Sequence, residues 1–470
     1  MTILVLDCGT SALKATAFAA DGAIVARAEA AYEPAAVDHR ASPESWWDAA
    51  VAAVHDLPPL EFRAIALTGT MENLIPVAED GAPLGEALLY TDPCGAPYLE
   101  RLRTGLDHID AAAIAGNAPE PLMTAFKLGW LRENEPRHFA EARWFLPGSK
   151  DFLALTLTGR AVTDASCAAT TGLMDLRSRQ WAEPLLDLFG IERARLPAIL
   201  PAAAIVGPLT HAAAAALDVA PGIPVINGCG DGAATTIGSG AERADDVSLY
   251  LGTSGWVARV AALGGGSRPF YRLPHPLIDG VIEIAPIISA GAAAQWARDA
   301  LGLDLAQAER LAAQADAAPS EVVFLPYLSG ERSPFVDLEL RGGFAGISAT
   351  DGAASLYYAA LEGVAFAIAA NLASMGGKGA GAVSLVGGGA LSATWPAILA
   401  DVLDAEISIP ADPVSATSLG AFRIAARALG LGEARSQVMR QVQPRADRRA
   451  RIERLGARFA ATTEFLRSLA

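Results

Sequence analysis

The chain has 470 residues, 52 % of them hydrophobic, and a formal net charge of −16. This length exceeds what one compact core usually organises, so we expect two domains. The acidic balance disfavours general binding to nucleic acid, because an acidic surface repels the phosphate backbone. The four cysteines and six histidines lack the spacing of metal sites, and this usage is typical of reduced thiols.

The N-terminus has no basic segment, and Asp7 interrupts its first apolar run. No uninterrupted apolar run reaches the roughly 18 residues that a membrane span needs. We therefore predict a cytoplasmic protein that binds neither membrane nor nucleic acid. The oligomeric state is left open, with a homodimer among the alternatives.

The first half begins with strands joined by tight turns. TILVLDCGT and ALKATAFAADGAIVARAEA are apolar runs, and Asp21-Gly22 is a hairpin signal, which together predict a meander. A helix is expected to begin at Pro43, followed by a buried strand at 65–68. Further on we expect helices at 111–131 and 181–189, then a strand at 223–227.

The second half repeats the opening pattern. VSLYLGTSGWVARV resembles LVLDCGTSALKATAF, with Gly-Thr-Ser at the bend in both, which indicates two related domains. Helices are predicted at 291–301, 353–375, 395–403 and 417–429, and strands at 322–325, 383–386 and 405–409. The last 38 residues hold nine Arg and four acids, and their helical spacing of apolar residues predicts a helix docked on the body.

The turn after the first strand has the residues of a phosphate-binding loop. Gly9 lets the backbone approach a phosphate, Thr10 and Ser11 offer hydroxyl donors, and Lys14 adds a positive charge or points to solvent. Asp7 would repel a phosphate unless a divalent cation lay between them. The loop therefore predicts Mg²⁺ held through water.

Two further glycine turns occur in the second half. Gly252-Thr253-Ser254 repeats the phosphate loop without an acid, as suits the phosphates of a nucleotide. The stretch 387–390, GGGA, follows an expected strand, and we predict that adenosine lies flat on its backbone. Each turn alone is more often a tight hairpin, but three in this order favour ATP binding.

Asp231 lies in the glycine-rich stretch GCGDGAATTIGSG and has three interpretations. A dinucleotide-binding loop is rejected, because its G-x-G-x-x-G spacing is absent and Asp231 would face the pyrophosphate. A helix N-cap remains open. The third interpretation is a general base that accepts the hydroxyl proton in phosphoryl transfer, and the last two are compatible.

From its first strand to its tail helix, the sequence resembles the FGGY carbohydrate kinases, most closely the xylulokinase-like members, in the actin/Hsp70/hexokinase superfamily. The similar motifs are the 7–14 loop, PESWW, ALTGTMENLIPVAEDGAPL, LLYTDPCG, TDASCAATTGLMDL, SLYLGTSG, FLPYLSGERSPF and SLVGGGALSATWPAILADVL. The resemblance implies an α/β fold of two ribonuclease H-like domains flanking a deep cleft. It divides the chain into a sugar-binding domain, 1–240, and an ATP-binding domain, 241–470.

The family motifs also imply site residues. Asp231 falls on the catalytic base, with Asp7 and Asp231 as candidate metal-binding residues. The implied sugar-binding residues are Met71, Glu72, Asp92, Asp231 and Gly232. The implied ATP-binding residues are Gly9, Thr10, Ser11, Lys14, Gly252, Thr253, Ser254, Gly291, Gln295, Gly388, Gly389, Ala390 and Ser392.

The sugar-side motifs depart from the xylulokinase pattern. Where xylulokinases usually read Gly-Gln-Met-His-Gly, this chain has Gly-Thr-Met-Glu-Asn, and Gly232 replaces the usual Asn after the catalytic Asp. We therefore expect an ATP:sugar kinase whose first candidate substrate is a ketopentose such as D-xylulose. The alternatives are another ketose, a glycerol-like polyol or an aldonate such as gluconate, a non-catalytic sugar sensor, and an actin- or Hsp70-like nucleotide switch.

Overall fold

A computed structural model describes residues 1–33, 39–264, 270–376, 382–432 and 438–469. The chain divides into two compact units. The first comprises Met1–Gly238, Ala262–Ile282 and Thr417–Arg435, and the second comprises Ser239–Ala261, Glu283–Ala416 and Ser436–Ala470. This division differs from the expected domains 1–240 and 241–470, because two later segments belong to the first unit.

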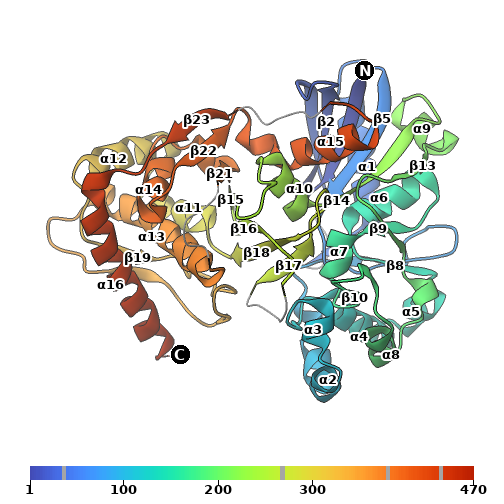
Figure 1. The fold of residues 1–470 in the computed structure, drawn as a ribbon, viewed down its shortest axis with the longest axis horizontal. Helices are drawn as coiled ribbons and strands as arrows, with labels where there is room; N and C mark the ends of the chain where they lie inside the picture. The colour runs from blue at the N-terminus through green and yellow to red at the C-terminus, as the bar shows by residue number, and fades with distance from the viewer. Residues whose placement is uncertain (34–38, 265–269, 377–381, 433–437, 470) are drawn as a thin grey trace. The chain divides into compact units, whose positions relative to one another are not determined.

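The first unit is built on a six-stranded sheet of order β13-β14-β5-β1-β2-β3 (Figure 1). Its strands are β1 (Thr2–Cys8), β2 (Ala12–Ala19), β3 (Ile24–Ala31), β5 (Phe62–Gly69), β13 (Ile205–Pro208) and β14 (Pro224–Gly230). β1 pairs antiparallel with β2 and parallel with β5, and β5 is parallel to β14. The predicted meander β1-β2-β3 is confirmed. The parallel strands β1, β5 and β14 therefore end at one edge of the sheet.

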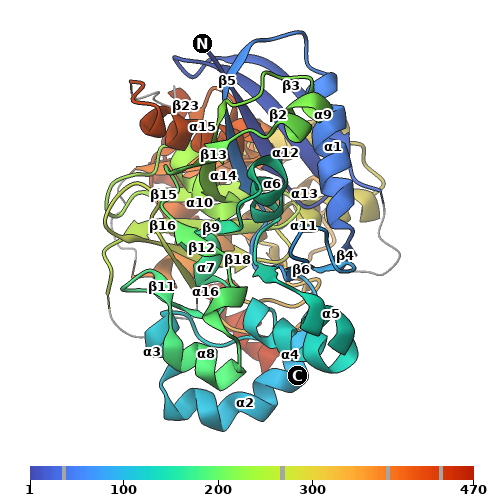
Figure 2. The same cartoon turned by 90° about the vertical axis from the view of Figure 1, so that its right-hand side faces the viewer.

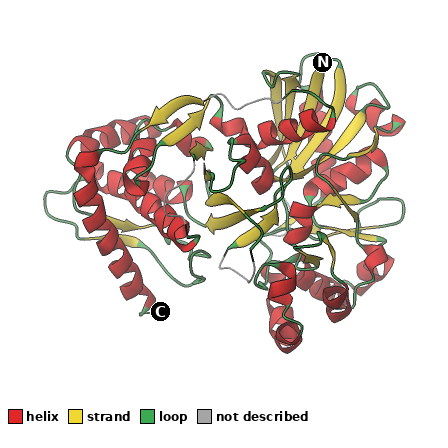
Figure 3. Cartoon of the chain, viewed as in Figure 1, coloured by secondary structure: helices red, strands yellow, loops and turns green. Residues whose placement is uncertain are grey.

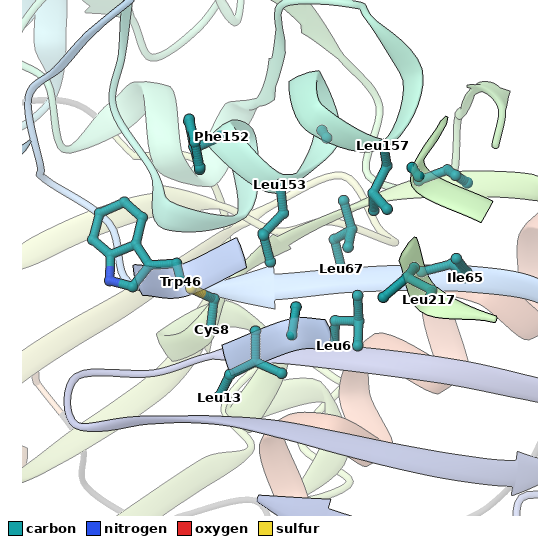
Figure 4. Packing of buried hydrophobic residues seen from close by; sticks show 14 of the residues in the cluster. Leu6, Cys8, Leu13, Trp46, Ile65, Leu67, Phe152, Leu153, Leu157 and Leu217 are labelled. Carbon is teal, nitrogen blue, oxygen red and sulfur yellow. The ribbon is translucent and has the colours of Figure 1, made fainter. Parts of the chain in front are cut away.

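Helices cover both faces of this sheet. On one face, α1 (Pro43–His55), α6 (Ser149–Thr158) and α9 (His211–Leu217) pack on alternate residues of the central strands. Figure 4 shows Leu153 and Leu157 of α6 beside Leu67 of β5. Trp46 is buried in the same cluster, and Trp47 packs against it.

Helix α15 (Ala416–Ala428) explains why the first unit is discontinuous in sequence. The Phe18 ring of β2 stacks on Phe422 of α15 with centroids 4.8 Å apart. A Cβ atom at Gly420 would lie 1.8 Å from the Ala234 carbonyl oxygen, so only glycine allows α15 to pack on α10 (Asp231–Gly238) this closely. The amphipathic pattern predicted the helix but not the sheet that it covers.

The remaining elements of the first unit include a helical group at one end, which Figures 1 and 2 both show. The helices of this group are α2 (Ala96–His108), α3 (Ala111–Ala115), α4 (Thr124–Asn134), α5 (Pro136–Glu141) and α8 (Glu183–Phe189), whereas α7 (Ala165–Ala169) packs against β14. The short strands are β4 (Arg40–Ala41), β6 (Ile75–Val77), β7 (Ala87–Leu88), β8 (Trp144–Leu146), β9 (Val162–Asp164), β10 (Met174–Asp175), β11 (Gln180–Trp181), β12 (Ala198–Leu200) and β17 (Tyr271–Pro274). The single helix expected at 111–131 is wrong. Two helices form there, and Pro119 and Pro121 lie in the break between them.

The second unit repeats the strand pattern of the first. Within this unit the strands run in the order β18-β16-β15-β21-β22-β23, and they are among the yellow strands of Figure 3. The strands are β15 (Val247–Leu251), β16 (Gly255–Ala261), β18 (Val281–Ile287), β21 (Val383–Val386), β22 (Ile407–Pro410) and β23 (Val438–Val442). β15 pairs antiparallel with β16 and parallel with β21, as β1 does with β2 and β5. The expectation of two related domains from the repeated Gly-Thr-Ser bend agrees with this topology.

Helix α13 (Ala353–Ser374) lies at the centre of the second unit. Around it are α11 (Gly291–Ala300), α12 (Leu305–Ala317), α14 (Trp395–Leu403), α16 (Arg449–Arg467), β19 (Val323–Leu325) and β20 (Gly343–Ala345). By length and composition α13 could cross a membrane, but 67 % of its most apolar stretch is buried, as in the core helix of a folded domain. The tail helix α16 docks through Ile452, Leu455 and Phe459, as predicted.

Candidate active site

Two carboxylates lie at the edge where β1 and β14 end. Asp7 is the penultimate residue of β1 and is buried, and Asp231 is the first residue of α10 and is half-buried. One oxygen of Asp231 accepts a hydrogen bond from the Gly232 N–H at 2.7 Å. The carboxylate therefore holds the start of α10, and this local role leaves the general-base interpretation open.

The environment of these carboxylates favours their protonated forms. Burial raises the pKa of Asp7 to about 6, with an opposing effect from Lys14. Burial, together with the neighbouring Asp7 carboxylate, raises the pKa of Asp231 to about 7. Within the described part of the chain, neither carboxylate forms a salt bridge with Lys or Arg. A carboxyl group tuned close to neutrality is suited to accepting a proton.

The glycine before Asp231 leaves room for a close neighbour. A Cβ atom at Gly230 would lie 2.0 Å from the Met71 sulfur. The β14–α10 turn and the segment after β5 therefore approach each other closely, and Met71 lies beside the turn that presents Asp231. The structure thus brings together two residues that the sequence resemblance assigned to one sugar site.

Glu72 continues this site and has an unusual backbone. Its φ angle is 62°, a left-handed conformation uncommon for residues other than glycine, and its side chain is buried. The fully buried Lys127 of α4 donates to the Glu72 carbonyl oxygen at 2.6 Å. The Tyr271 hydroxyl donates to Glu72 Oε1 at 3.4 Å. Backbone and side chain of Glu72 are thus held by separate partners.

Asp92 has both carboxylate oxygens engaged. Oδ1 accepts from the Cys94 N–H at 2.9 Å, and Oδ2 accepts from Arg40 Nε at 3.1 Å. Arg40 also lies over the Trp130 ring, 4.5 Å from its centroid. Burial lowers the pKa of Lys127 to about 8, although the nearby acids Glu72 and Asp92 oppose this shift. The hydrogen bonds of Asp92 with Cys94 and Arg40 hold its carboxylate in place, in addition to the sugar contact that was predicted for it.

The predicted phosphate loop between β1 and β2 presents its donors to solvent. Thr10 and Ser11 are exposed, and the Thr10 and Tyr90 hydroxyls are 3.2 Å apart. Lys14 is also exposed and pairs with Asp7 across the β1–β2 hairpin, so both side chains leave the same face of the sheet. Lys14 is therefore a solvent-facing cation that lies close to Asp7.

In the second unit, three strand ends pack backbone against backbone. The Gly291 N–H donates to the Gly252 carbonyl oxygen at 2.9 Å, and a Cβ atom at Gly291 would lie 2.2 Å from that oxygen. Gly387 has a φ of 89°, and its Cβ atom would lie 2.5 Å from the Leu251 carbonyl oxygen. Only glycine fits at 291 and 387, so the absence of side chains there lets these three turns pack closely together.

The other predicted nucleotide residues surround this cluster. Thr253, Ser254 and Gln295 are exposed, Gly388 is exposed in a short 3₁₀-helix, and Ala390 is buried. The Ser392 hydroxyl donates to Glu309 at 2.9 Å and accepts the Trp395 N–H at 3.1 Å, so it stabilises the start of α14. The predicted site residues thus form two sets, one in each unit.

Two residues of the first set were not predicted from the sequence. Lys127 is the lone charge in TAFKLGWL, and a buried cation in an apolar helix segment was a usable signal. Tyr271 reaches Glu72 from a segment 199 positions later in the chain. No local pattern marks Tyr271, because its partner is determined by tertiary packing.

The strand order, repeated in both units, is that of the actin-like ATPase fold, and the class that matches it is the two-domain carbohydrate kinase. Residues 2–238 match the FGGY family of carbohydrate kinases, N-terminal domain, and residues 282–429 match the C-terminal domain. The chain belongs to the FGGY family of carbohydrate kinases.

Several named relatives are similar over most of their length. A xylulose kinase of Escherichia coli (strain K12) is 32 % identical over 434 residues, which cover 89 % of this chain and 88 % of the relative. A glycerol kinase of Allorhizobium ampelinum is 31 % identical and covers 91 % and 90 %. The crystal structure of a xyloylose kinase from Brucella ovis superposes with a TM-score of 0.90, at 28 % identity and full coverage of both chains.

These findings confirm the predicted family, fold class and enzyme class. The protein is a phosphotransferase that uses ATP as co-substrate and acts on a small-molecule sugar. The nucleotide-switch and sugar-sensor alternatives are set aside. Xylulose and glycerol kinases match at nearly equal identity, so the substrate itself requires a separate argument.

Proposed function

We propose that this kinase transfers the γ-phosphoryl group of ATP to a hydroxyl of a small neutral sugar, with Asp231 as the general base. The observation that carries this proposal is the half-buried Asp231 carboxylate, which has a raised pKa and no cationic salt-bridge partner among the described residues. Such a group can orient a hydroxyl and accept its proton. A positioned base of this kind contributes about 10²–10⁴-fold to rate.

In the proposed transfer step, Asp231 takes up the proton that the sugar hydroxyl loses. As the sugar hydroxyl oxygen forms its bond to the γ-phosphorus, its proton passes to Asp231, and the bond between the γ-phosphorus and its bridging oxygen breaks to release ADP. The Gly9, Thr10 and Ser11 turn of the first unit and the Gly252, Thr253 and Ser254 turn of the second are the proposed phosphate contacts. The exposed Gly388 surface, with Gly389 and Ala390, is proposed for adenosine.

The carboxylate pair fits Mg²⁺. Asp7 raises the pKa of Asp231, so the two carboxylates repel each other, and a bound divalent cation would relieve that repulsion. The described residues contain no cluster of three or more His, Cys, Asp or Glu that could hold a metal. Mg²⁺ commonly binds through only one or two carboxylates, with water and substrate phosphates as its other ligands. When bound, it would neutralise charge on those phosphates.

The chemistry around Glu72 supports a neutral substrate. A buried carboxylate accepts hydrogen bonds from sugar hydroxyls and repels a carboxylate on the substrate. We therefore propose a ketopentose such as D-xylulose as the first candidate, and another ketose or a glycerol-like polyol as alternatives. Aldonates such as gluconate are disfavoured.

The proposal is tested by measuring ADP release from the purified protein with Mg²⁺ and ATP against pentuloses, hexuloses, polyols and aldonates. One neutral sugar should raise the rate over the sugar-free reaction by about 10²-fold. An aldonate as the best substrate would contradict the role given to Glu72. If every sugar leaves the rate unchanged, the proposed function is wrong.

A double variant tests whether Glu72 and Gly232 line the sugar site. Glu72→His with Gly232→Asn restores the residues usual in xylulokinases, and we expect kcat/KM to shift toward D-xylulose by about tenfold relative to the other sugars. The matched control is Glu61→His, because Glu61 is exposed and pairs with Arg63. An unchanged sugar profile in the double variant would place both residues outside the site.

A further inference from the structure

A fully buried polar network lies behind the turn that presents Asp231. Its centre is Lys150 of α6, whose side chain has no exposed surface. The Lys150 ammonium contacts Asp151 Oδ1 at 2.7 Å, Asp164 Oδ1 at 3.2 Å and Asn227 Oδ1 at 3.3 Å. Asp151 and Asn227 accept hydrogen bonds from the ammonium, and Asp164 Oδ1 is an ion-pair partner without a hydrogen bond, so three contacts hold Lys150 in place.

One branch of the network leads to the residue before Asp231. Asp164 Oδ2 accepts the Ser166 N–H at 2.7 Å and the Ser166 hydroxyl at 2.5 Å. Because the hydroxyl proton is used there, Ser166 Oγ is free to act as acceptor, and it takes the Gly230 N–H at 3.0 Å. A continuous series of contacts therefore runs from Lys150 through Asp164 and Ser166 to Gly230.

A second branch of the network holds β14 where its pairing with β5 is irregular. The pairing of β14 with β5 shifts register between Ile226 and Cys229, and Gly228 there has a φ of 68°. Asn227 Oδ1 accepts a hydrogen bond from the Lys150 ammonium, and Asn227 Nδ2 donates to the Thr163 carbonyl oxygen at 3.0 Å. The Lys150 network thus holds β14 at Asn227, within the irregular stretch, and at Gly230, after it.

Stability alone is a weak explanation of this arrangement. The network buries one ammonium with two carboxylates, and the cost of removing such charges from water largely offsets their attraction. Burial raises the pKa of Asp151 to about 6, which reflects this cost. The hydrogen bonds of this buried network do, however, favour one geometry over its near alternatives.

We propose that Ser166, held by Asp164 and Lys150, is a positioning residue for Asp231. This inference rests on the proposed role of Asp231 as general base. Ser166 does not touch substrate in this proposal. It acts through the Gly230 N–H, which fixes the turn from β14 into α10. A general base must lie within hydrogen-bond reach of its proton, and a displacement of about 1 Å can reduce the rate about 10²-fold.

The test is steady-state kinetics of the full chain with ATP and the best sugar from the panel. Ser166→Ala leaves the Gly230 N–H without its acceptor, and we expect kcat to fall by about tenfold or more while KM for ATP stays within about twofold. Ser166→Cys, which keeps a weak acceptor, should recover part of kcat. The matched control is Thr170→Ala, which removes another buried hydroxyl next to α7, bonded to the Cys167 carbonyl at 2.9 Å.

Each outcome separates this inference from the proposed function. Equal kcat values for Ser166→Ala and Thr170→Ala, at matched melting temperatures, overturn the positioning role. If Ser166→Ala does not fold, Ser166→Cys is compared with Thr170→Ala by the same criterion. Asp231→Ala serves as reference. If it is inactive while both Ser166 variants are normal, only the inference fails, and if it remains active, the proposed base itself is wrong.

Discussion

The ends of β1 and β15 occupy equivalent places in two units with the same strand pattern, yet they carry different chemistry. The penultimate residue of β1 is Asp7, a carboxylate whose charge raises the pKa of Asp231. The residue that follows β15 is Gly252, and Gly291 packs against its backbone. One framework thus presents acids in the first unit and bare backbone in the second. This difference is why we propose proton transfer for the first unit and nucleotide binding for the second.

Removing the acid of the first unit should have the largest effect. In Asp231→Ala the sugar hydroxyl loses its proton acceptor, and we expect kcat to fall about 10²–10⁴-fold. KM for ATP should change little, because the glycine cluster of the second unit is untouched. Single-turnover measurements of ADP formation would separate the chemical step from binding. Activity within tenfold of the original protein would contradict the base assignment.

A side chain added to the glycine cluster of the second unit should instead affect KM for ATP. A Cβ atom in Gly291→Ala would lie 2.2 Å from the Gly252 carbonyl oxygen and push the two turns apart. We expect KM for ATP to rise by about tenfold, with a smaller effect on KM for the sugar. Gly432→Ala is the control, because a Cβ atom there meets nothing within 4 Å. If KM for the sugar rises instead, the division of roles between the units is wrong.

A smaller effect concerns the buried cation of the first unit. Because the pKa of Lys127 is lowered to about 8, the unfolded chain binds more protons than the folded chain between about pH 8 and the ordinary lysine pKa near 10.5. The destabilisation is therefore fully present below pH 8 and is relieved as the pH rises. In urea unfolding, the stability of the original protein relative to Lys127→Met should increase by about 2 kcal/mol from pH 8 to pH 10. A difference independent of pH would show that Lys127 titrates normally.

Local patterns were sufficient wherever a segment's environment follows from its own residues. The meander β1-β2-β3 follows from apolar runs separated by Asp21-Gly22, and the repeated Gly-Thr-Ser bend indicated the second sheet. The pattern misled at 111–131, where apolar periodicity continued across Pro119 and Pro121. Gly116, whose φ is 72°, ends α3, and Pro119 and Pro121 lie in the segment before α4 begins at Thr124.

The acidic residues of the candidate site were predicted from the sequence, but the side chains that hold them in place were not. Motif resemblance named Asp7, Glu72 and Asp231 as functional candidates. It did not show that Lys127 and Tyr271 hold Glu72, or that the Ser166 hydroxyl receives the Gly230 N–H. Those contacts join residues 55, 199 and 64 positions apart. Side-chain partners at such separations depend on how strands and helices pack, which no window of sequence contains.

By itself, the sequence determined the order of elements, the glycine turns and the identity of the acids, because backbone preference and residue chemistry are local properties. The tertiary structure decided that α15 belongs to the first unit, that burial brings Asp231 close to neutrality, and that Lys150 lies behind its turn. These outcomes depend on which surfaces exclude water from which groups. Desolvation and close packing are collective effects, and they arise only once the chain has folded.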